Sequence, residues 1–315
     1  MKKFLFGVFV VLGLVGILAT QPLVTAAGAQ TPAVDAAVLQ KHVKYLSVDV
    51  YPRSFDFPEH LNAAADYIKN DLTAVGIVVE EQKYLVQGVP YRNLIARFGP
   101  ADGKVLVMGA HYDSHGDTPG ADDNASGVAG LLELAKLLQK SPPSRPVELV
   151  FYTLEEPPYF RTENMGSAVH SRSLVESKRP VDMMISVEMI GYFTDAPDSQ
   201  SFPLSAMKLV YPTQGNFIAV VGRYKDMVAT RRVKSALKGV DGLPVRSINA
   251  PALVTGIDFS DHLNYWAQGF SAVMVTDTSF YRNHEYHRSG DTYERLNYPR
   301  MAQVVQGLYQ LAQQP

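Results

Sequence analysis

The stretch that decides the fold reads Val105-Leu106-Val107-Met108-Gly109-Ala110-His111-Tyr112-Asp113. Residues 105–110 carry no polar side chain, which is typical of a strand buried on both faces of a parallel sheet. Polar residues follow at once. In open α/β sheets, binding sites gather beyond the carboxyl ends of the strands. The stretch therefore predicts a buried strand that delivers His111 and Asp113 to a site.

The rest of the chain repeats this order of apolar run, polar loop and helix. Helical periodicity is found over residues 39–46 and 61–75. Further strand-like runs cover residues 78–86, 91–98, 147–154, 183–187, 217–221 and 272–276. Apolar strands that alternate with helices indicate a sheet covered on both faces. We predict a single three-layer α/β/α domain over residues 37–315, with a central mixed, mostly parallel sheet.

The N-terminus has the features of a secretory signal peptide over residues 1–29. Lys2 and Lys3 precede an apolar run over residues 4–18, and Ala27-Gly28-Ala29 matches a small-x-small cleavage site. The run is shorter than the roughly 20 residues of a typical membrane-spanning helix. We therefore expect cleavage after Ala29, a flexible start over residues 30–36, and an exported protein without a stable membrane span. The alternative is an uncleaved segment that anchors the protein in the membrane.

The composition excludes several classes of protein and of site. Among 315 residues, 46% are hydrophobic and 19% charged, as in ordinary globular domains. A net charge of −2 gives no reason to expect a nucleic-acid partner. The chain contains no cysteine, so disulfides, thiol nucleophiles and cysteine-ligated metals are excluded. Any bound metal must be held by nitrogen and oxygen atoms.

Four of the predicted strands lead into the same kinds of residue. A single glutamate after a strand is usually a solvated loop residue, but histidines and carboxylates at four strand ends indicate a metal site. These residues are His111 and Asp113 after residues 105–110, Glu155 and Glu156 after 147–154, Glu188 after 183–187, and Tyr286 and His287 in the loop after 272–276.

A further ligand candidate lies in the loop Gly120-Ala121-Asp122-Asp123-Asn124-Ala125-Ser126-Gly127, which precedes a predicted helix. Asp123 or Asn124 suits the N-cap of that helix. Capping does not explain two adjacent aspartates at the same rim as His111. Dinuclear hydrolytic sites require a ligand that two metal ions share, and we take Asp122 as the candidate bridge.

Together these segments resemble the co-catalytic dizinc exopeptidases. These are the aminopeptidase-Y-like metallopeptidases, which are related to bacterial leucyl aminopeptidases and glutaminyl cyclases. The resemblance extends from about residue 37 to the C-terminus. It is carried by Gly109-Ala110-His111-Tyr112-Asp113, the 120–127 loop, Glu155-Glu156, Glu188-Met189-Ile190-Gly191 and Tyr286-His287.

The resemblance implies two Zn²⁺ ions per chain. His111 would bind one ion and His287 the other, and Asp122 would bridge both. Glu156 would join one ion and Glu188, where many relatives carry aspartate, the other. In this family the two aspartates at the bridge are usually joined by a cis peptide, so we expect one between Asp122 and Asp123.

The remaining roles are implied in the same way. Glu155 would be the general base, and Asp113 would accept a hydrogen bond from the free ring nitrogen of His111. The Tyr286 hydroxyl is the candidate donor to the oxyanion. The solvated loop is the favoured interpretation of His115 and Asp117.

Three further expectations concern residues outside the metal motif. We assign His262 to the structure or to the residues that support the metal ligands, and not to a metal, and we assign Trp266 to the core. Phe280 and Tyr281 are expected to line a substrate pocket. After Glu156 the chain has Pro157-Pro158 where many relatives have glycine, so that wall of the pocket is expected to differ.

The implied activity is that of a secreted aminopeptidase, which hydrolyses the N-terminal bond of a peptide or small aminoacyl substrate with a zinc-bridging hydroxide. A carboxypeptidase or a single-zinc glutaminyl cyclase on the same scaffold is one alternative. A non-catalytic peptidase-like binding module is another. The oligomeric state stays open.

Overall fold

The computed structural model describes residues 16, 19–28 and 31–315. Of the predicted leader, only residues 16 and 19–28 fall within this range, and residue 30 of the predicted flexible start also lies outside it. No helix in the described ranges is long and apolar enough to cross a bilayer.

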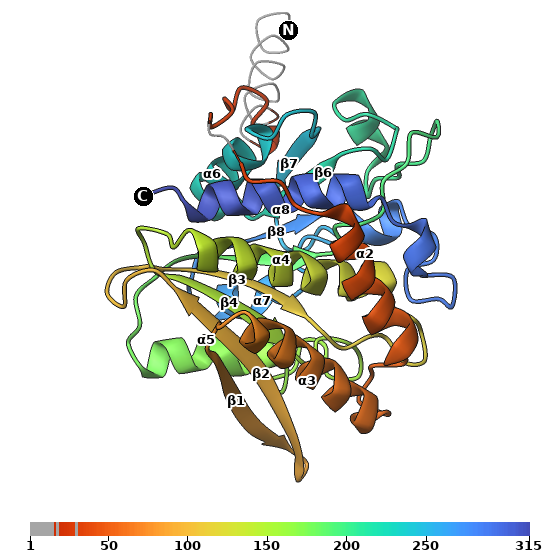
Figure 1. Cartoon of the computed structure of the whole chain (residues 1–315). Helices are drawn as coiled ribbons and strands as arrows, with labels where there is room; N and C mark the ends of the chain where they lie inside the picture. Colours follow the sequence, from red (N-terminus) through yellow and green to blue (C-terminus); the bar gives the residue numbers. More distant parts are fainter. Residues whose placement is uncertain (1–15, 17–18, 29–30) are drawn as a thin grey trace, which may run out of the picture.

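One mixed sheet forms the centre of the described chain, with the strand order β1-β2-β4-β3-β5-β8-β6-β7 (Figure 1). Its strands are β1 Val79–Val86, β2 Val89–Phe98, β3 Val105–His111, β4 Val147–Tyr152, β5 Val181–Glu188, β6 Ile218–Gly222, β7 Val245–Asn249 and β8 Ala272–Thr276. The central strands β4, β3, β5 and β8 pair in parallel. Antiparallel pairs β1–β2, β2–β4 and β6–β8 extend the sheet outward.

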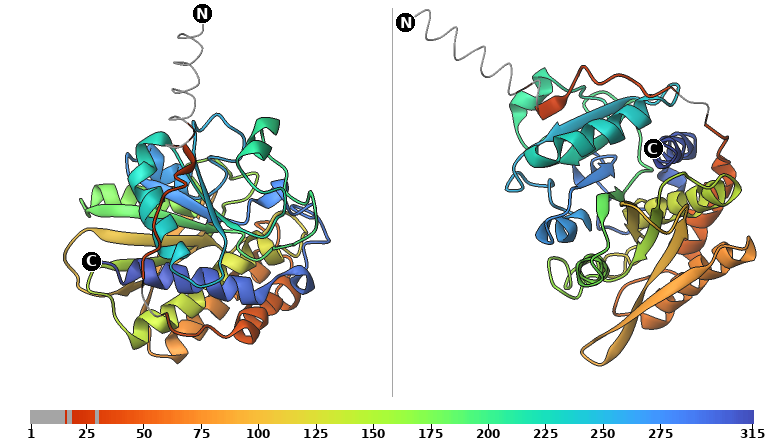
Figure 2. Two further views of the ribbon diagram at one scale, coloured as in Figure 1. Left: turned by 90° about the horizontal axis from the view of Figure 1, so that it is seen from above. Right: turned by 90° about the vertical axis from the view of Figure 1, so that its left-hand side faces the viewer.

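Helices cover both faces of the sheet (Figure 2). They are α2 Ala36–Lys44, α3 Pro58–Ala74, α4 Gly127–Lys140, α5 Gly166–Glu176, α6 Met227–Lys238, α7 His262–Ala267 and α8 Tyr298–Ala312. Buried side chains of α2, α3, α4, α6 and α8 pack in one core, and those of α5 and α7 pack in the other. The three-layer α/β/α prediction is confirmed.

Strand β3 shows why the apolar runs become central strands. Every residue of β3 is buried. Leu106 and Met108 face the core beneath α4, whereas Val105 and Val107 face the core of α5 and α7, because successive strand side chains alternate between faces. Both faces are therefore apolar, and the first polar residue marks the end of the strand.

Strand β7 was not predicted. Its sequence, Val-Arg-Ser-Ile-Asn, lacks a continuous apolar run because β7 lies at the edge of the sheet and, among the described strands, pairs only with β6. An edge strand with half-buried residues carries a weaker sequence signal than a central one.

Candidate metal centre

The carboxyl ends of the central strands bring the predicted residues together. His111 is the last residue of β3 and Glu188 the last residue of β5. Glu155 and Glu156 follow the end of β4, and His287 lies in the loop after β8. Contacts between side chains from different strand ends, such as His111 with Glu188 and His287 with Glu156, support the prediction that these ends meet at one rim.

The side chains form two groups that share Asp123. His111 Nε2 lies 3.4 Å from Asp123 Oδ1 and 3.3 Å from Glu188 Oε2. His287 Nε2 lies 3.1 Å from Asp123 Oδ2 and 3.2 Å from Glu156 Oε2. Ligand atoms within each group are no more than 4.8 Å apart. The two oxygens of one carboxylate thus face two different imidazole–glutamate pairs.

Asp123, and not Asp122, therefore occupies the bridging position, so the assignment of Asp122 was wrong. The Asp122 carboxylate is directed elsewhere. Its Oδ1 accepts the Gly191 N–H at 3.0 Å, and its Oδ2 accepts Asn283 Nδ2 at 3.1 Å. These donors hold Asp122 against the loops that follow β5 and β8, and the next residue in the chain faces the histidines.

The cis peptide is displaced by one residue from the expected position, since it joins Asp123 to Asn124. Asn124 ties this loop to the end of β5. Its Nδ2 donates to Val187 O at 2.9 Å, and its Oδ1 accepts the N–H groups of Met189 at 3.0 Å and Gly127 at 3.1 Å. The loop that carries Asp123 is therefore fixed to the strand that carries Glu188.

Asp291 also orients this loop and was missed by the sequence analysis. Its carboxylate accepts the backbone N–H of Asp122 at 3.1 Å and that of Asp123 at 3.1 Å. Asp291 lies far along the chain from this loop, so only the folded structure brings them together.

Arg53 is a second residue that the sequence analysis missed. Its guanidinium is fully buried and donates to backbone carbonyls of the segments that lead to the centre. The acceptors are Leu46, Tyr112, Pro119 and Gly120, at 2.7–3.0 Å. Burial lowers the pKa of Arg53 to about 10, although nearby carboxylates such as Asp113 oppose this shift. The Arg53 guanidinium thus joins these backbone segments through its hydrogen bonds to their carbonyl groups.

Asp113 lies beside His111, and its main-chain carbonyl oxygen is nearer to the ring than its carboxylate. His111 Nδ1 is 3.1 Å from the Asp113 carbonyl oxygen and 3.6 Å from Asp113 Oδ1. The other carboxylate oxygen accepts the Glu156 N–H at 3.1 Å. With Nδ1 turned toward oxygen acceptors, Nε2 of His111 is left to face the centre.

Glu155 is adjacent to both groups but belongs to neither. Its Oε2 lies 4.0 Å from His111 Nε2, and the residue is 6% exposed. Burial raises the pKa of Glu155 well above its usual range, and the neighbouring Glu156 and Glu188 add to this shift. A carboxyl group with a raised pKa is suited to proton transfer near neutral pH.

The centre holds more carboxylates than its two imidazoles can neutralise. Burial raises the pKa of Glu156 to about 7 and also raises the pKa of Glu188. Burial lowers the pKa of His287, but hydrogen bonds to Asp123 and Glu156 outweigh this effect and bring it to about 10. Buried carboxylates in this number are stabilised by bound cations.

The donor set fits zinc. Each group offers one imidazole nitrogen and two carboxylate oxygens, which are ligands that Zn²⁺ accepts. Three protein ligands leave a tetrahedral ion one open position, as in catalytic sites. Among the described residues, Glu156 Oε1 is buried and has no hydrogen-bond partner, so it is available to an ion.

The backbone near the centre adopts conformations that are rare outside glycine. Leu154, Met189 and His287 have φ angles of 58°, 49° and 58°. Leu154 precedes Glu155, and Met189 follows Glu188. Left-handed backbone at non-glycine residues is uncommon and collects at functional sites.

Two rings stack on His287. Tyr286 lies 3.7 Å from it at an interplanar angle of 19°, and His115 lies 3.9 Å away at 13°. Burial raises the pKa of Tyr286 above its usual range, and Asp123 and Glu156 add to this shift. His115 is half-buried against the centre, so the solvated-loop interpretation was wrong for it, whereas Asp117 is exposed.

His262 and Trp266 lie away from the two groups. His262 is buried, with Nε2 2.8 Å from the Ile257 carbonyl oxygen. Its ring packs edge-on against Trp266 at 4.5 Å. Trp266 is buried, as predicted.

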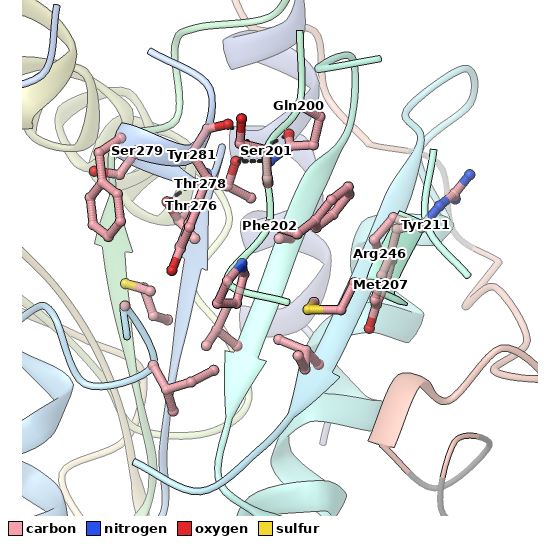
Figure 3. Close-up of a pocket in the computed structure, with 18 of the residues that line it drawn as sticks. Gln200, Ser201, Phe202, Met207, Tyr211, Arg246, Thr276, Thr278, Ser279 and Tyr281 are labelled. Atoms are coloured by element: carbon pink, nitrogen blue, oxygen red, sulfur yellow. Dashed lines mark hydrogen bonds between the residues drawn. The ribbon is translucent and has the colours of Figure 1, made fainter. Parts of the chain in front are cut away.

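A largely apolar pocket (Figure 3) has Glu188 of the centre among its lining residues. Phe280 and Tyr281 also line this pocket. One wall is held by hydrogen bonds, since Gln200 Nε2 donates to Thr278 Oγ1 at 2.8 Å and the Ser201 N–H donates to Tyr281 O at 2.7 Å. The Pro157–Pro158 peptide that follows Glu156 is cis.

The chain is similar to several known proteins. The profile of peptidase family M28 matches residues 93–312. The protein YfbL of Escherichia coli strain K12 is 50% identical over 99% of this chain and 98% of its own. Leucine aminopeptidase 1 of Uncinocarpus reesii is 27% identical over 70% of this chain, which spans 54% of that relative. The structure of a Bacteroides thetaiotaomicron glutaminyl cyclase has the same fold, with a TM-score of 0.69 and 20% identity over 91% of this chain and 100% of the cyclase.

Proposed function

The chain belongs to peptidase family M28, and from that premise we propose that it is a zinc-dependent aminopeptidase. Its substrates would be peptides or small aminoacyl compounds with a free amino terminus. The observation that carries the proposal is the position of the Asp123 carboxylate between two imidazole–glutamate pairs.

Two zinc ions per chain are proposed, with one set of ligands for each. His111 and Glu188 would hold one ion and His287 and Glu156 the other, while Asp123 would hold both. When bound, the ions would supply Lewis-acid polarisation of the scissile carbonyl and a water of lowered pKa. Asp113 would fix the tautomer of His111 through its contacts with Nδ1.

Glu155 is the proposed general base. Its side chain would take a proton from the attacking water and deliver that proton to the leaving amine. Its place outside both ligand groups supports this role, because its oxygens stay free to exchange a proton. Tyr286, next to His287, is the proposed hydroxyl donor to the oxyanion.

The apolar pocket beside Glu188 is the proposed site for the substrate side chain. Phe280 and Tyr281 contribute aromatic surface to it, which would favour large apolar side chains.

The proposal is tested with a substrate panel and a chelator. Aminoacyl substrates, N-acetylated peptides, peptides with a free carboxyl terminus and peptides with N-terminal glutamine are compared. Hydrolysis that requires a free amino terminus and is abolished by chelation would support the aminopeptidase. Release of C-terminal residues would support a carboxypeptidase, and cyclisation of N-terminal glutamine would support a cyclase. No turnover with zinc bound would support a binding module.

The N-terminal segment is proposed to direct export to the periplasm or beyond. Lys2, Lys3 and the apolar run over residues 4–18 support this.

A further inference from the structure

Residues 20–27, here called the N-terminal strap, lie against α6 and β7 (Figure 2). They belong to the segment that cleavage after Ala29 would remove. Gln21 is 5% exposed, and Val24 is also buried. Cleavage after Ala29 would remove these buried side chains from the folded protein.

Lys234 on α6 donates hydrogen bonds to the backbone of the strap. Its side chain is 4% exposed, and Nζ donates to Thr20 O at 2.9 Å, Gln21 O at 2.8 Å and Ser247 Oγ at 3.0 Å. Two of these three acceptors belong to the strap. A buried ammonium needs acceptors for its protons, and here the strap supplies most of them.

Both ends of the strap are held by further hydrogen bonds. At one end, Gln21 Nε2 donates to Met227 O at 3.0 Å and to Asn249 Oδ1 at 2.8 Å. At the other end, the Ala27 N–H donates to Ser235 O at 2.9 Å, and Lys238 Nζ donates to Val24 O at 2.6 Å.

Gly239, just after α6, makes room for the strap. A Cβ atom at this position would lie 2.0 Å from the Ala27 carbonyl oxygen. The end of α6 therefore matches the path of the strap in shape as well as in hydrogen bonding. Ser247, whose Oγ donates to Thr20 O at 2.8 Å, also lines the substrate pocket, so the strap supports a strand of the pocket wall.

We propose that the chain is not cut after Ala29 and that the N-terminal strap stays in the working protein as part of its fold. This inference favours an uncleaved N-terminal segment over the cleaved leader and does not depend on the activity of the metal centre.

The direct test is the intact mass of the protein purified after expression of the full chain in a Gram-negative bacterium. We expect a mass that includes residues 20–29. A product that begins at Gln30, or anywhere between residues 21 and 30, would overturn the proposal.

A second test measures hydrogen exchange of residues 19–28 in the full chain. Lys234→Met keeps the aliphatic stem and removes the donors, and Lys225→Met at an exposed lysine is the matched control. We expect exchange to be at least about tenfold faster in Lys234→Met and unchanged in the control. If Lys234→Met does not fold, Lys238→Met serves in its place. Exchange as fast as in an unstructured peptide in the wild type would overturn the proposal.

Discussion

Oδ2 of Asp291 accepts the backbone N–H of Asp123 at 3.1 Å. This hydrogen bond reaches across the fold to the loop whose carboxylate faces both histidines. The orientation of Asp123 therefore depends on a residue that belongs to neither group of candidate ligands.

Removal of this acceptor should weaken metal binding. We expect Asp291→Ala to lower zinc affinity about 10- to 100-fold, because outer contacts orient the ligands. Competition with a chromophoric chelator measures the affinity. Asp102→Ala, at an exposed loop position, is the control and should bind as the wild type does. Equal affinity in both variants would show that Asp291 does not orient the loop.

The proposed base can be separated from the proposed ligands. Glu155→Gln should retain both zinc ions yet lose about 10²- to 10⁴-fold in kcat, because the amide cannot accept the proton of the attacking water. Metal content by plasma mass spectrometry and kcat on an aminoacyl substrate are the two readouts. Glu163→Gln, at an exposed position, is the matched change. A wild-type kcat in Glu155→Gln would remove Glu155 from the mechanism.

Arg53 should be irreplaceable by lysine. Arg53→Lys keeps the charge, but an ammonium cannot reach carbonyls that the planar guanidinium contacts on several sides. We expect a loss of about 3 kcal/mol or more in the free energy of unfolding, because buried acceptors are left unpaired. Urea unfolding measures it, with Arg288→Lys at an exposed site as the control. A loss in unfolding free energy below about 1 kcal/mol would show that the hydrogen bonds of Arg53 are not needed to hold these backbone segments in place.

His262 should make the fold sensitive to acid. Burial lowers its pKa from 6.5 to about 4, so the folded state favours the neutral ring. Between pH 6.5 and 4 the unfolded chain binds a proton that the folded chain does not, and stability therefore falls as pH falls. The contribution is about 3 kcal/mol.

The measurement compares unfolding free energies at several pH values for the wild type and His262→Gln, both with chelator so that the metal centre contributes equally. We expect a shallower decline below pH 6.5 in the variant. Parallel curves would show that His262 does not titrate in this way.

The site residues that can be predicted from the sequence differ from those found only in the structure in how the fold positions them. His111, Glu155, Glu156 and Glu188 were recognisable because each ends a buried strand or follows one closely, so a local pattern predicts where it lies. Asp291 and Arg53 act through backbone groups far along the chain, and no local pattern marks them.

The choice between Asp122 and Asp123 shows the limit within a single motif. Both are aspartates in one loop at the same rim, so residue type and spacing do not separate them. The decision comes from the Gly191 N–H and Asn283, which hold Asp122 away from the histidines. The same dependence on tertiary contacts explains why the sequence predicts a solvated loop position for His115, which stacks on His287.

The most direct test of the account is the zinc content of Asp123→Asn beside that of Asp122→Asn. We expect two zinc ions per chain in the wild type and in Asp122→Asn, since an asparagine there can still accept the Gly191 N–H. We expect Asp123→Asn to lose at least one ion and its aminopeptidase activity, because the amide cannot serve both groups. Two retained ions in Asp123→Asn, with loss of metal in Asp122→Asn, would contradict the assignment of Asp123 as the shared ligand.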